Sequence, residues 1–138
     1  TIKYKYTFNK FRFVTFMQFS GNLNSNQPFK TGLIFEPVDG SYSNYFAFAR
    51  SGGKIVLSYN GIVLSNEFNF DPAKKYYMVI DTNSGKVILD FGYINGNNMI
   101  SLYTREMGSV DTGRLYKFGI REETSGAIDI IYTFPAGN

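Results

Sequence analysis

Carboxylates, histidines and cysteines supply most enzyme chemistry, and this sequence of 138 residues offers few arrangements of them that could work. It contains no histidine and no cysteine, which removes imidazole bases, thiol nucleophiles and the commonest transition-metal ligands. Glycoside hydrolysis needs two carboxylates about 5 to 10 Å apart, and no glutamate lies in a Glu-x-Glu or Glu-x-Asp pattern within an apolar strand. We therefore expect a protein without enzymatic activity.

Aspartates are the remaining candidates for metal binding. Asp39 and Asp111 are oxygen ligands of the kind that Ca²⁺ prefers, but no spaced Asp-x-Asn motif accompanies either of them. Asp81 and Asp90 are expected to share one sheet face across a hairpin, an arrangement that suits a solvated edge or a Ca²⁺ contact better than catalysis. We expect no resident cofactor, with Ca²⁺ as the weaker alternative.

Five residues have types that suit ligand binding, and they lie in or beside one stretch rich in tyrosine and asparagine. Tyr45 has a ring that can stack on the apolar face of a sugar while its hydroxyl stays hydrated, and Tyr42 lies at the border of the same surface. Arg50 and Asn44 are expected to hydrogen-bond hydroxyl groups or a carboxylate, and Asn60 to supplement them. Asparagine also tolerates left-handed turn geometry, so each loop asparagine has a purely structural alternative.

The elements that must position these residues are β-strands. Apolar and polar residues alternate with a period of two, and turn residues interrupt the pattern every eight to twelve positions, which predicts an all-β antiparallel β-sandwich in a single domain over residues 1–138. A single helical turn is expected at most at 72–75 or 105–113. The expected strands are 2–8, 11–19, 31–35, 43–51, 54–59, 62–66, 75–82, 86–94, 99–105, 115–122 and 127–134.

Three two-residue turns predict the register of consecutive hairpins. Gly52-Gly53 suits the positive φ angles of tight hairpin turns, and Asn60-Gly61 is the strongest short hairpin signal in the chain. The turn at 84–85 pairs Ile80 with Leu89 and Met78 with Phe91. The first two turns place one buried row on the core face: Phe46, Phe48, Ile55, Leu57, Tyr59, Ile62 and Leu64.

The opposite face of the first two hairpins carries small and uncharged side chains. Tyr45, Ala47, Ala49, Val56 and Ser58 lie there, where a solvated face would carry lysine and glutamate. Either a loop or the N-terminal strand covers this face, or it is a shallow floor for a flat ligand with Tyr45 as the stacking platform.

The direction of the chain sorts the loops into two groups. If neighbouring strands alternate in direction, loops 37–42, 60–61, 83–85 and 106–114 share one end of the sandwich. Arg50 and the asparagine-rich loops then lie at the other end.

From Phe11 onward, the order of strand patterns resembles the concanavalin A-like lectin/glucanase superfamily, especially its laminin-G-like and carbohydrate-binding sandwiches. The stretches that carry the resemblance are Phe11–Phe19, Thr31–Phe35 followed by Asn44–Phe48, Gly53–Leu57, Lys75–Ile80, Gly119–Glu122 and Ala127–Ile131. The resemblance implies a jelly-roll sandwich and, as the commonest role, glycan binding. The chain lacks tryptophan and the paired catalytic glutamates of the glucanases, so any stacking platform must be tyrosine or phenylalanine.

Composition sets the remaining expectations. No apolar run approaches the roughly 20 residues that cross a bilayer, and the net charge of +3 is scattered, which argues against membrane insertion and nucleic-acid binding. The N-terminus lacks a signal peptide and an initiator methionine, so we expect a domain excised from a larger protein with flanking domains. The sequence predicts a non-catalytic carbohydrate-binding module for a glycan or polysaccharide, located outside the cell or on a virion surface. The alternative is a structural or protein-interaction sandwich, including an accessory domain of a bacteriophage tail or an adhesin.

Overall fold

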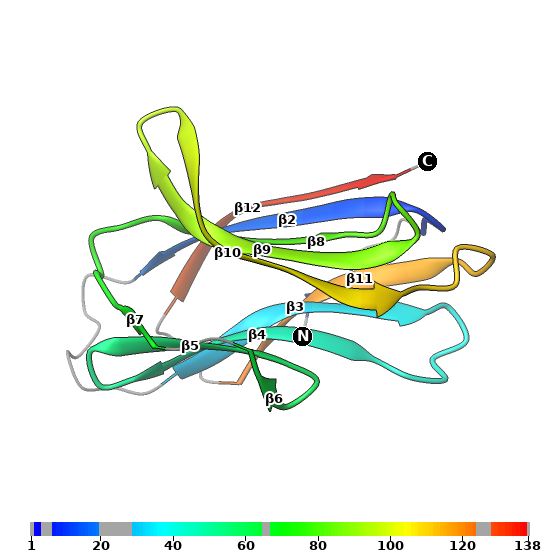
Figure 1. The fold of residues 1–138 in the computed structure, drawn as a ribbon, viewed down its shortest axis with the longest axis horizontal. Helices are drawn as coiled ribbons and strands as arrows, with labels where there is room; N and C mark the ends of the chain where they lie inside the picture. Colours follow the sequence, from blue (N-terminus) through cyan, green and yellow to red (C-terminus); the bar gives the residue numbers. More distant parts are fainter. Residues whose placement is uncertain (1, 4–6, 20–28, 65–66, 124–127, 138) are drawn as a thin grey trace.

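In the computed structural model, two antiparallel sheets pack face to face as an all-β sandwich (Figure 1). The structure describes residues 2–3, 7–19, 29–64, 67–123 and 128–137, and these contain no helix, hence none that could cross a membrane. Sheet A consists of β1 (Ile2–Lys3), β3 (Phe29–Pro37), β4 (Asn44–Ser51), β5 (Lys54–Tyr59), β6 (Ile62–Val63), β7 (Phe68–Asn69) and β11 (Tyr116–Glu122). Sheet B consists of β2 (Phe11–Phe19), β8 (Tyr76–Asp81), β9 (Lys86–Asn95), β10 (Asn98–Ser109) and β12 (Ile128–Gly137).

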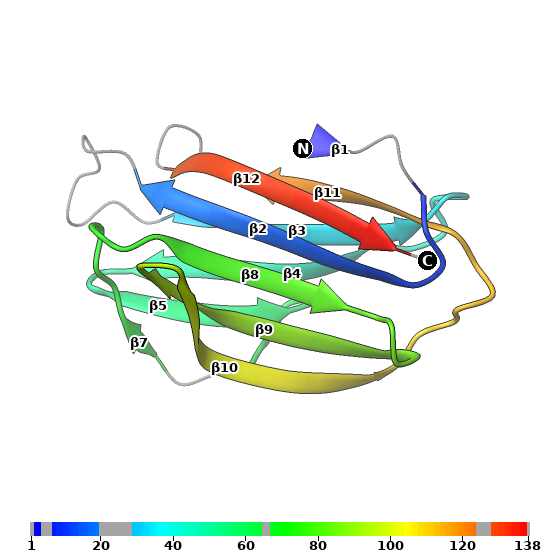
Figure 2. The same ribbon diagram turned by 90° about the horizontal axis from the view of Figure 1, so that it is seen from above.

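The order of the strands shows how the chain passes between the sheets. Sheet A runs β1-β11-β3-β4-β5-β6, with β7 also paired to β5, and sheet B runs β10-β9-β8-β2-β12. Figure 2 shows β12 and β10 at the two edges of sheet B, above the strands of sheet A. Strands β3 to β6 and β8 to β10 follow one another as antiparallel neighbours, whereas β2 and β11 join distant parts of the sequence. This arrangement is of the jelly-roll kind expected from the sequence.

The predicted registers of the three hairpins are confirmed. Ser51 pairs with Lys54 around a two-residue turn in which Gly52 has a φ of 61°. Asn60 and Gly61 have φ angles of 51° and 82°, the left-handed pair that a type I′ turn requires. In the third hairpin the pairs are Met78 with Phe91 and Ile80 with Leu89.

The second hairpin departs from the prediction beyond its turn. Ile62 was expected in the core, but its side chain is 66% exposed, because β6 is a strand of two residues at the edge of sheet A. Leu64 does pack against the core as a half-buried residue. Residues 65–66 of the expected strand 62–66 lie outside the described residues.

The ends of several other strands also differ from the expectation. In place of the expected strand 2–8, β1 covers only residues 2–3, and Phe8 forms an isolated bridge with Tyr116. Positions 4–6, loop 20–28 and position 127 lie outside the described residues. The expected helical turn in 105–113 is wrong, since β10 continues to Ser109 with register shifts after Ser101 and Glu106. The described residues 72–75 form a turn that is not helical.

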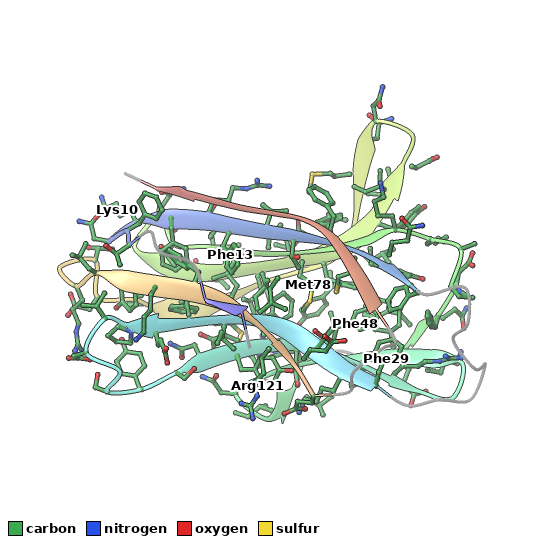
Figure 3. The ribbon with its side chains drawn as sticks, turned by 180° about the vertical axis from the view of Figure 1, so that it is seen from behind. Lys10, Phe13, Phe29, Phe48, Met78 and Arg121 are labelled. Atoms are coloured by element: carbon green, nitrogen blue, oxygen red, sulfur yellow. The ribbon has the colours of Figure 1, made fainter. Side chains whose placement is uncertain are left out.

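Aromatic side chains fill the space between the sheets, because alternate residues of each strand point inward. Phe29 and Phe48 of sheet A stack with ring centroids 5.6 Å apart, and Phe48 also meets Phe91 of sheet B at 5.5 Å. Figure 3 shows Phe13 and Met78 reaching between the sheets from the opposite side. Full burial of such rings supplies most of the hydrophobic stabilisation of a sandwich.

The loops that were predicted to share one end do so. The backbone N–H of Val38 donates to the carbonyl of Leu115 at 3.1 Å, and that of Val110 donates to Gly85 at 3.0 Å. Loop 37–42 therefore contacts the connection between β10 and β11, which in turn contacts the turn after β8. This end of the sandwich holds the candidate site.

Candidate functional site

A cavity of about 230 Å³ lies between the two sheets at this end, and we call it the end cavity. Its lining comes from β3, β4 and β5 of sheet A, from β9 and β10 of sheet B, and from the two loops that meet there. The lining residues are Phe35, Tyr42, Asn44, Tyr59, Val87, Met107, Ser109, Val110 and Asp111.

The deep part of the end cavity is apolar. Phe35 from sheet A and Val87 from sheet B are both buried members of the main core, so the cavity reaches the gap between the sheets. Tyr59 is buried at the end of β5, and this burial raises the pKa of its hydroxyl. Tyr42, by contrast, is an exposed loop residue, so its ring lies where the cavity meets solvent.

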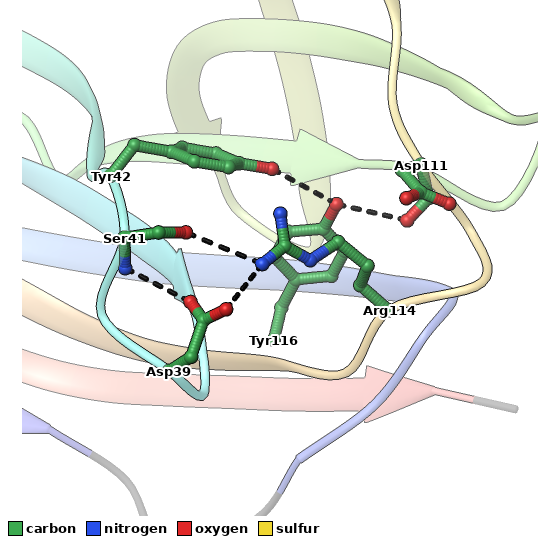
Figure 4. A network of polar contacts seen from close by, with 6 residues as sticks. All are labelled: Asp39, Ser41, Tyr42, Asp111, Arg114 and Tyr116. Carbon is green, nitrogen blue, oxygen red and sulfur yellow. Dashed lines mark hydrogen bonds and ion pairs between the residues drawn. The ribbon is translucent and has the colours of Figure 1, made fainter.

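An arginine holds the loop that carries Tyr42 (Figure 4). Arg114 Nη2 forms an ion pair with Asp39 Oδ2, contacts Ser41 Oγ at 3.3 Å, and its guanidinium lies 5.7 Å from the ring centroid of Tyr42. The backbone N–H of Ser41 donates to Asp39 Oδ1 at 2.9 Å. This hydrogen bond, followed by the Arg114 charge, lowers the pKa of Asp39.

The hydroxyl groups of two tyrosines form a chain beside the cavity. Tyr116 donates its only hydroxyl proton to the carbonyl oxygen of Asp111 at 2.9 Å. In the contact of 3.2 Å between the hydroxyls of Tyr42 and Tyr116, Tyr42 must therefore be the donor. Burial raises the pKa of Tyr116. The Tyr42 oxygen keeps its lone pairs for hydrogen bonds from a ligand.

The turn after β5 fixes the orientation of Asn44. The backbone N–H of Tyr45 can only donate, so the atom of Asn60 that it meets at 2.8 Å is the amide oxygen. The nitrogen of Asn60 then faces Asn44 and donates to its Oδ1 at 3.0 Å. The left-handed φ of Asn60 brings its side chain back over this strand end. Both the oxygen and the nitrogen of its amide thus take part in holding the hairpin.

Besides the hydroxyls of Tyr59 and Ser109, two side-chain atoms of the lining have no hydrogen-bond partner among the described residues. One is Nδ2 of Asn44, whose Oδ1 is taken by Asn60. The other is Oδ2 of Asp111, whose Oδ1 accepts from the backbone N–H of Gly113 at 2.9 Å. With the hydroxyls of Tyr42, Tyr59 and Ser109, the end cavity presents both donor and acceptor groups around apolar walls.

The structure separates the five residues proposed from the sequence into three places. Tyr42, Asn44 and Asn60 gather at the end cavity, the first two in its lining and the third behind Asn44. Tyr45 lies on the outer face of sheet A, and Arg50 lies at the opposite end of β4. The five residues therefore do not form one continuous surface.

Tyr45 interacts with its own sheet. The cationic groups of Lys30 and Arg121 lie 5.6 Å and 5.2 Å from its ring centroid, and Figure 3 shows Arg121 on the outer side of sheet A. Ala47, in the middle of the expected floor, is only 1% exposed. Burial raises the pKa of Tyr45, whose hydroxyl oxygen is enclosed without a hydrogen-bond partner among the described residues. Of the two alternatives for this face, the open floor is therefore wrong at its centre.

Arg50 is 7% exposed, although the sequence places a charge there. Its guanidinium lies 4.5 Å from the ring centroid of Phe70, and its Nε donates to the carbonyl of Gly52 at 2.7 Å. Stacking on an aromatic ring and bonding to the turn compensate for the removal of the charge from water. These contacts make Arg50 a structural residue of the first hairpin.

The expected acidic pair on sheet B also proves to be tied to its neighbours. Asp90 Oδ1 accepts from Ser101 at 2.6 Å and from Thr104 at 3.2 Å, and its Oδ2 accepts from Tyr77 at 3.2 Å. Oδ2 of Asp81 lies 3.9 Å from Nε of Arg12, with which it forms an ion pair. Among the described residues no group of three or more carboxylate, histidine or cysteine side chains could hold a metal ion.

Sequence reasoning missed most of the cavity lining. Tyr59 was counted only as core, and Val87, Met107, Ser109 and Val110 were not singled out. The signal that could have found the last three is the grouping of loops, because 106–114 was placed at the same end as 37–42. The alternation of apolar and polar residues along the strands does not predict how the edge of one sheet packs over the other.

Comparisons with solved structures agree with the fold. The chain is similar to a xylan beta-1,4-xylosidase from Bacillus halodurans with a TM-score of 0.54, 14% identity and coverage of 91% of this chain and 27% of that one. It is similar to a GH43 protein from Bacillus licheniformis with a TM-score of 0.51, 13% identity and coverage of 94% and 28%. It is also similar to a Scytalido-glutamic peptidase with a TM-score of 0.50, 10% identity and coverage of 94% of this chain and 70% of that one.

These likenesses define the class of the protein as a jelly-roll-like β-sandwich and, at such low identity, show the fold alone. The chain spans about a quarter of the length of the two Bacillus proteins. No protein-family model and no curated protein matches the sequence.

Proposed function

We propose that this domain is a non-catalytic carbohydrate-binding module and that it binds a sugar in the end cavity. The observation that carries the proposal is the pairing of aromatic walls with hydrogen-bonding atoms that no described residue uses. A sugar has an apolar ring face and several hydroxyls, so it matches both features of this lining.

The size of the end cavity favours one sugar unit. Pockets for drug-sized ligands occupy roughly 300–1,000 Å³, whereas this cavity has about 230 Å³. A chain end or a branch would enter it, with the rest of the glycan leaving past Tyr42 at the exposed rim.

The absence of catalysis is also part of the proposal. Glycoside hydrolysis uses two carboxylates that flank the bond, and Asp111 is the single carboxylate in the described lining. The neighbouring Asp39 is neutralised by Arg114. We further propose membership of the concanavalin A-like superfamily, no resident cofactor, and a location outside the cell or on a virion surface as one module of a larger protein.

Calorimetric titration with a panel of methyl glycosides and polysaccharides tests the proposed function. We expect saturable binding of at least one sugar, weakened in the Asp111→Asn variant. That change keeps the oxygen that accepts from Gly113 and replaces only the atom that faces the ligand. Tyr45→Phe is the matched control, because it removes a hydroxyl on the outer face and should leave binding unchanged. Absence of binding across the panel would refute the proposal.

Exposed apolar side chains favour a second candidate, a protein-interaction sandwich. Val38 and Leu115 lie side by side at the rim of the cavity end, and Ile62 and Val63 are exposed on β6. Such side chains gather at protein interfaces when they form a continuous patch. Light scattering coupled to size-exclusion chromatography would show a stable oligomer if the exposed residues of β6 mediate self-association. The double variant Ile62→Ser with Val63→Ser would then dissociate this oligomer.

A further inference from the structure

One free donor in the end cavity is an amide N–H₂ group in a fixed orientation. Asn60 donates to Oδ1 of Asn44, and its own orientation follows from the backbone N–H of Tyr45. The Asn44 side chain therefore cannot exchange its oxygen and nitrogen without losing this bond. A ligand that meets Nδ2 of Asn44 must offer an acceptor.

An apolar surface lies directly beside that donor. Asn44 and Phe35 are cross-strand partners, so their Cβ atoms are roughly 5 Å apart on the same sheet face. Val87 lies in the opposite wall, and Met107 has a flexible side chain that adapts to the shape of a small apolar group. This part of the cavity thus combines the oriented amide donor of Asn44 with a small apolar recess.

The charge of the lining sets a further condition. Asp111 is the one charged residue among those that line the cavity, and no described residue bonds its Oδ2. A carboxylate accepts hydrogen bonds from sugar hydroxyls, but it repels the carboxylate of an acidic sugar. The net charge of +3 on the whole chain would otherwise favour acidic glycans.

We infer that the end cavity takes an N-acetylated amino sugar at a chain end; this inference rests on the proposed function. The acetamido group carries a carbonyl oxygen and a methyl group on the same carbon. The oxygen accepts from Nδ2 of Asn44 while the methyl group lies against Phe35 and Val87. A ring hydroxyl donates to Oδ2 of Asp111.

Titration of matched sugar pairs tests this inference on the intact chain. The probes are the methyl glycosides of N-acetylglucosamine and glucose, those of N-acetylgalactosamine and galactose, and methyl glucuronide. One added hydrogen bond together with a buried methyl group predicts that an N-acetylated sugar binds about tenfold more tightly than its plain partner. We expect the glucuronide to bind most weakly of the five.

The variant Asn44→Asp isolates the donor. An aspartate still accepts from Asn60, so the hairpin contact is kept, but the carboxylate cannot donate to an acetamido oxygen. The tenfold preference should disappear in this variant, so that an N-acetylated sugar and its plain partner bind with equal affinity. Tyr45→Phe should keep the full preference.

The outcomes separate this inference from the proposed function. Equal affinity for N-acetylated and plain sugars, or tightest binding of the glucuronide, overturns the inference and leaves sugar binding standing. No binding of any probe overturns both. The sugar pairs on the unaltered protein decide the matter even if Asn44→Asp fails to fold.

Discussion

Asn60 donates from its side-chain amide to Oδ1 of Asn44 at 3.0 Å, so a turn residue holds a side chain of the cavity lining in place. The same amide accepts from the backbone N–H of Tyr45 at 2.8 Å. The left-handed φ of 51° at Asn60 makes both contacts available at once. The strongest hairpin signal in the sequence is thereby connected to the candidate site.

Replacing Asn60 should lower stability in two separable steps. Asn60→Gly keeps the left-handed turn and removes only the side-chain bonds, so we expect a loss of about 1 kcal/mol in the free energy of unfolding. Asn60→Ala adds the strain of a Cβ atom at positive φ, for a total of about 2 kcal/mol. Urea unfolding measures both values. An alanine variant as stable as the glycine variant would contradict this account of the turn.

Gly32 should not tolerate a side chain. A Cβ atom there would lie 1.9 Å from the carbonyl oxygen of Phe46, a backbone atom that the hairpin holds in place. We expect Gly32→Ala to lower the free energy of unfolding by about 3 kcal/mol. Gly53→Ala is the matched control, because nothing lies within 4 Å of its added Cβ, and it should stay within about 0.5 kcal/mol of the parent. Comparable losses in both variants would disprove the close approach at Gly32.

The contacts of Asp39 predict a loss of stability in acid. Its pKa is lowered from the ordinary 3.8 by the hydrogen bond from Ser41 and by the charge of Arg114. A lowered carboxyl pKa stabilises the fold above about pH 4, and this contribution is lost as the pH falls further. In Asp39→Asn, the dependence of unfolding free energy on pH should be shallower in that range. An unchanged pH dependence would show that Asp39 does not contribute.

The raised pKa of Tyr77 predicts that stability is lost as the pH rises into the alkaline range. Burial, followed by the charge of Asp90, raises its pKa from 10.0 to about 12. The unfolded chain loses this proton near pH 10 and the folded chain does not, so the contribution of Tyr77 is full below pH 10 and declines above it. In an absorbance titration of the folded protein, Tyr77→Phe should remove phenolate signal near pH 12. Loss of signal near pH 10 instead would contradict the burial of this hydroxyl.

The sequence predicted the sandwich and its hairpins because local chemistry determines them. Asn60 and Gly61 require a tight left-handed turn, and the alternation of Phe46 and Phe48 then has one consistent inward face. Side-chain period and turn length together leave no freedom in the register. The pairs around Met78 follow from the same argument.

The candidate site was only partly predictable, since it depends on how the sheets meet. Tyr42, Val87 and Asp111 belong to three separate stretches of the chain, and their meeting depends on packing between sheets. Arg50 was expected to hydrogen-bond a ligand, but Phe70 covers it from a loop whose position no pattern reveals. A strand pattern assigns Tyr45 to a face without showing that Lys30 and Arg121 already contact its ring there.

The most direct test of sugar binding in the end cavity is an NMR titration of isotope-labelled protein with the sugar that binds best in the panel. Sugar binding in the end cavity predicts saturable chemical-shift changes at the side-chain amide of Asn44 and at the backbone amides of Tyr42 and Asp111. The signals of Lys30 and Arg121 should remain unchanged. Shifts confined to the outer face around Tyr45, or no shift with any sugar, would contradict it.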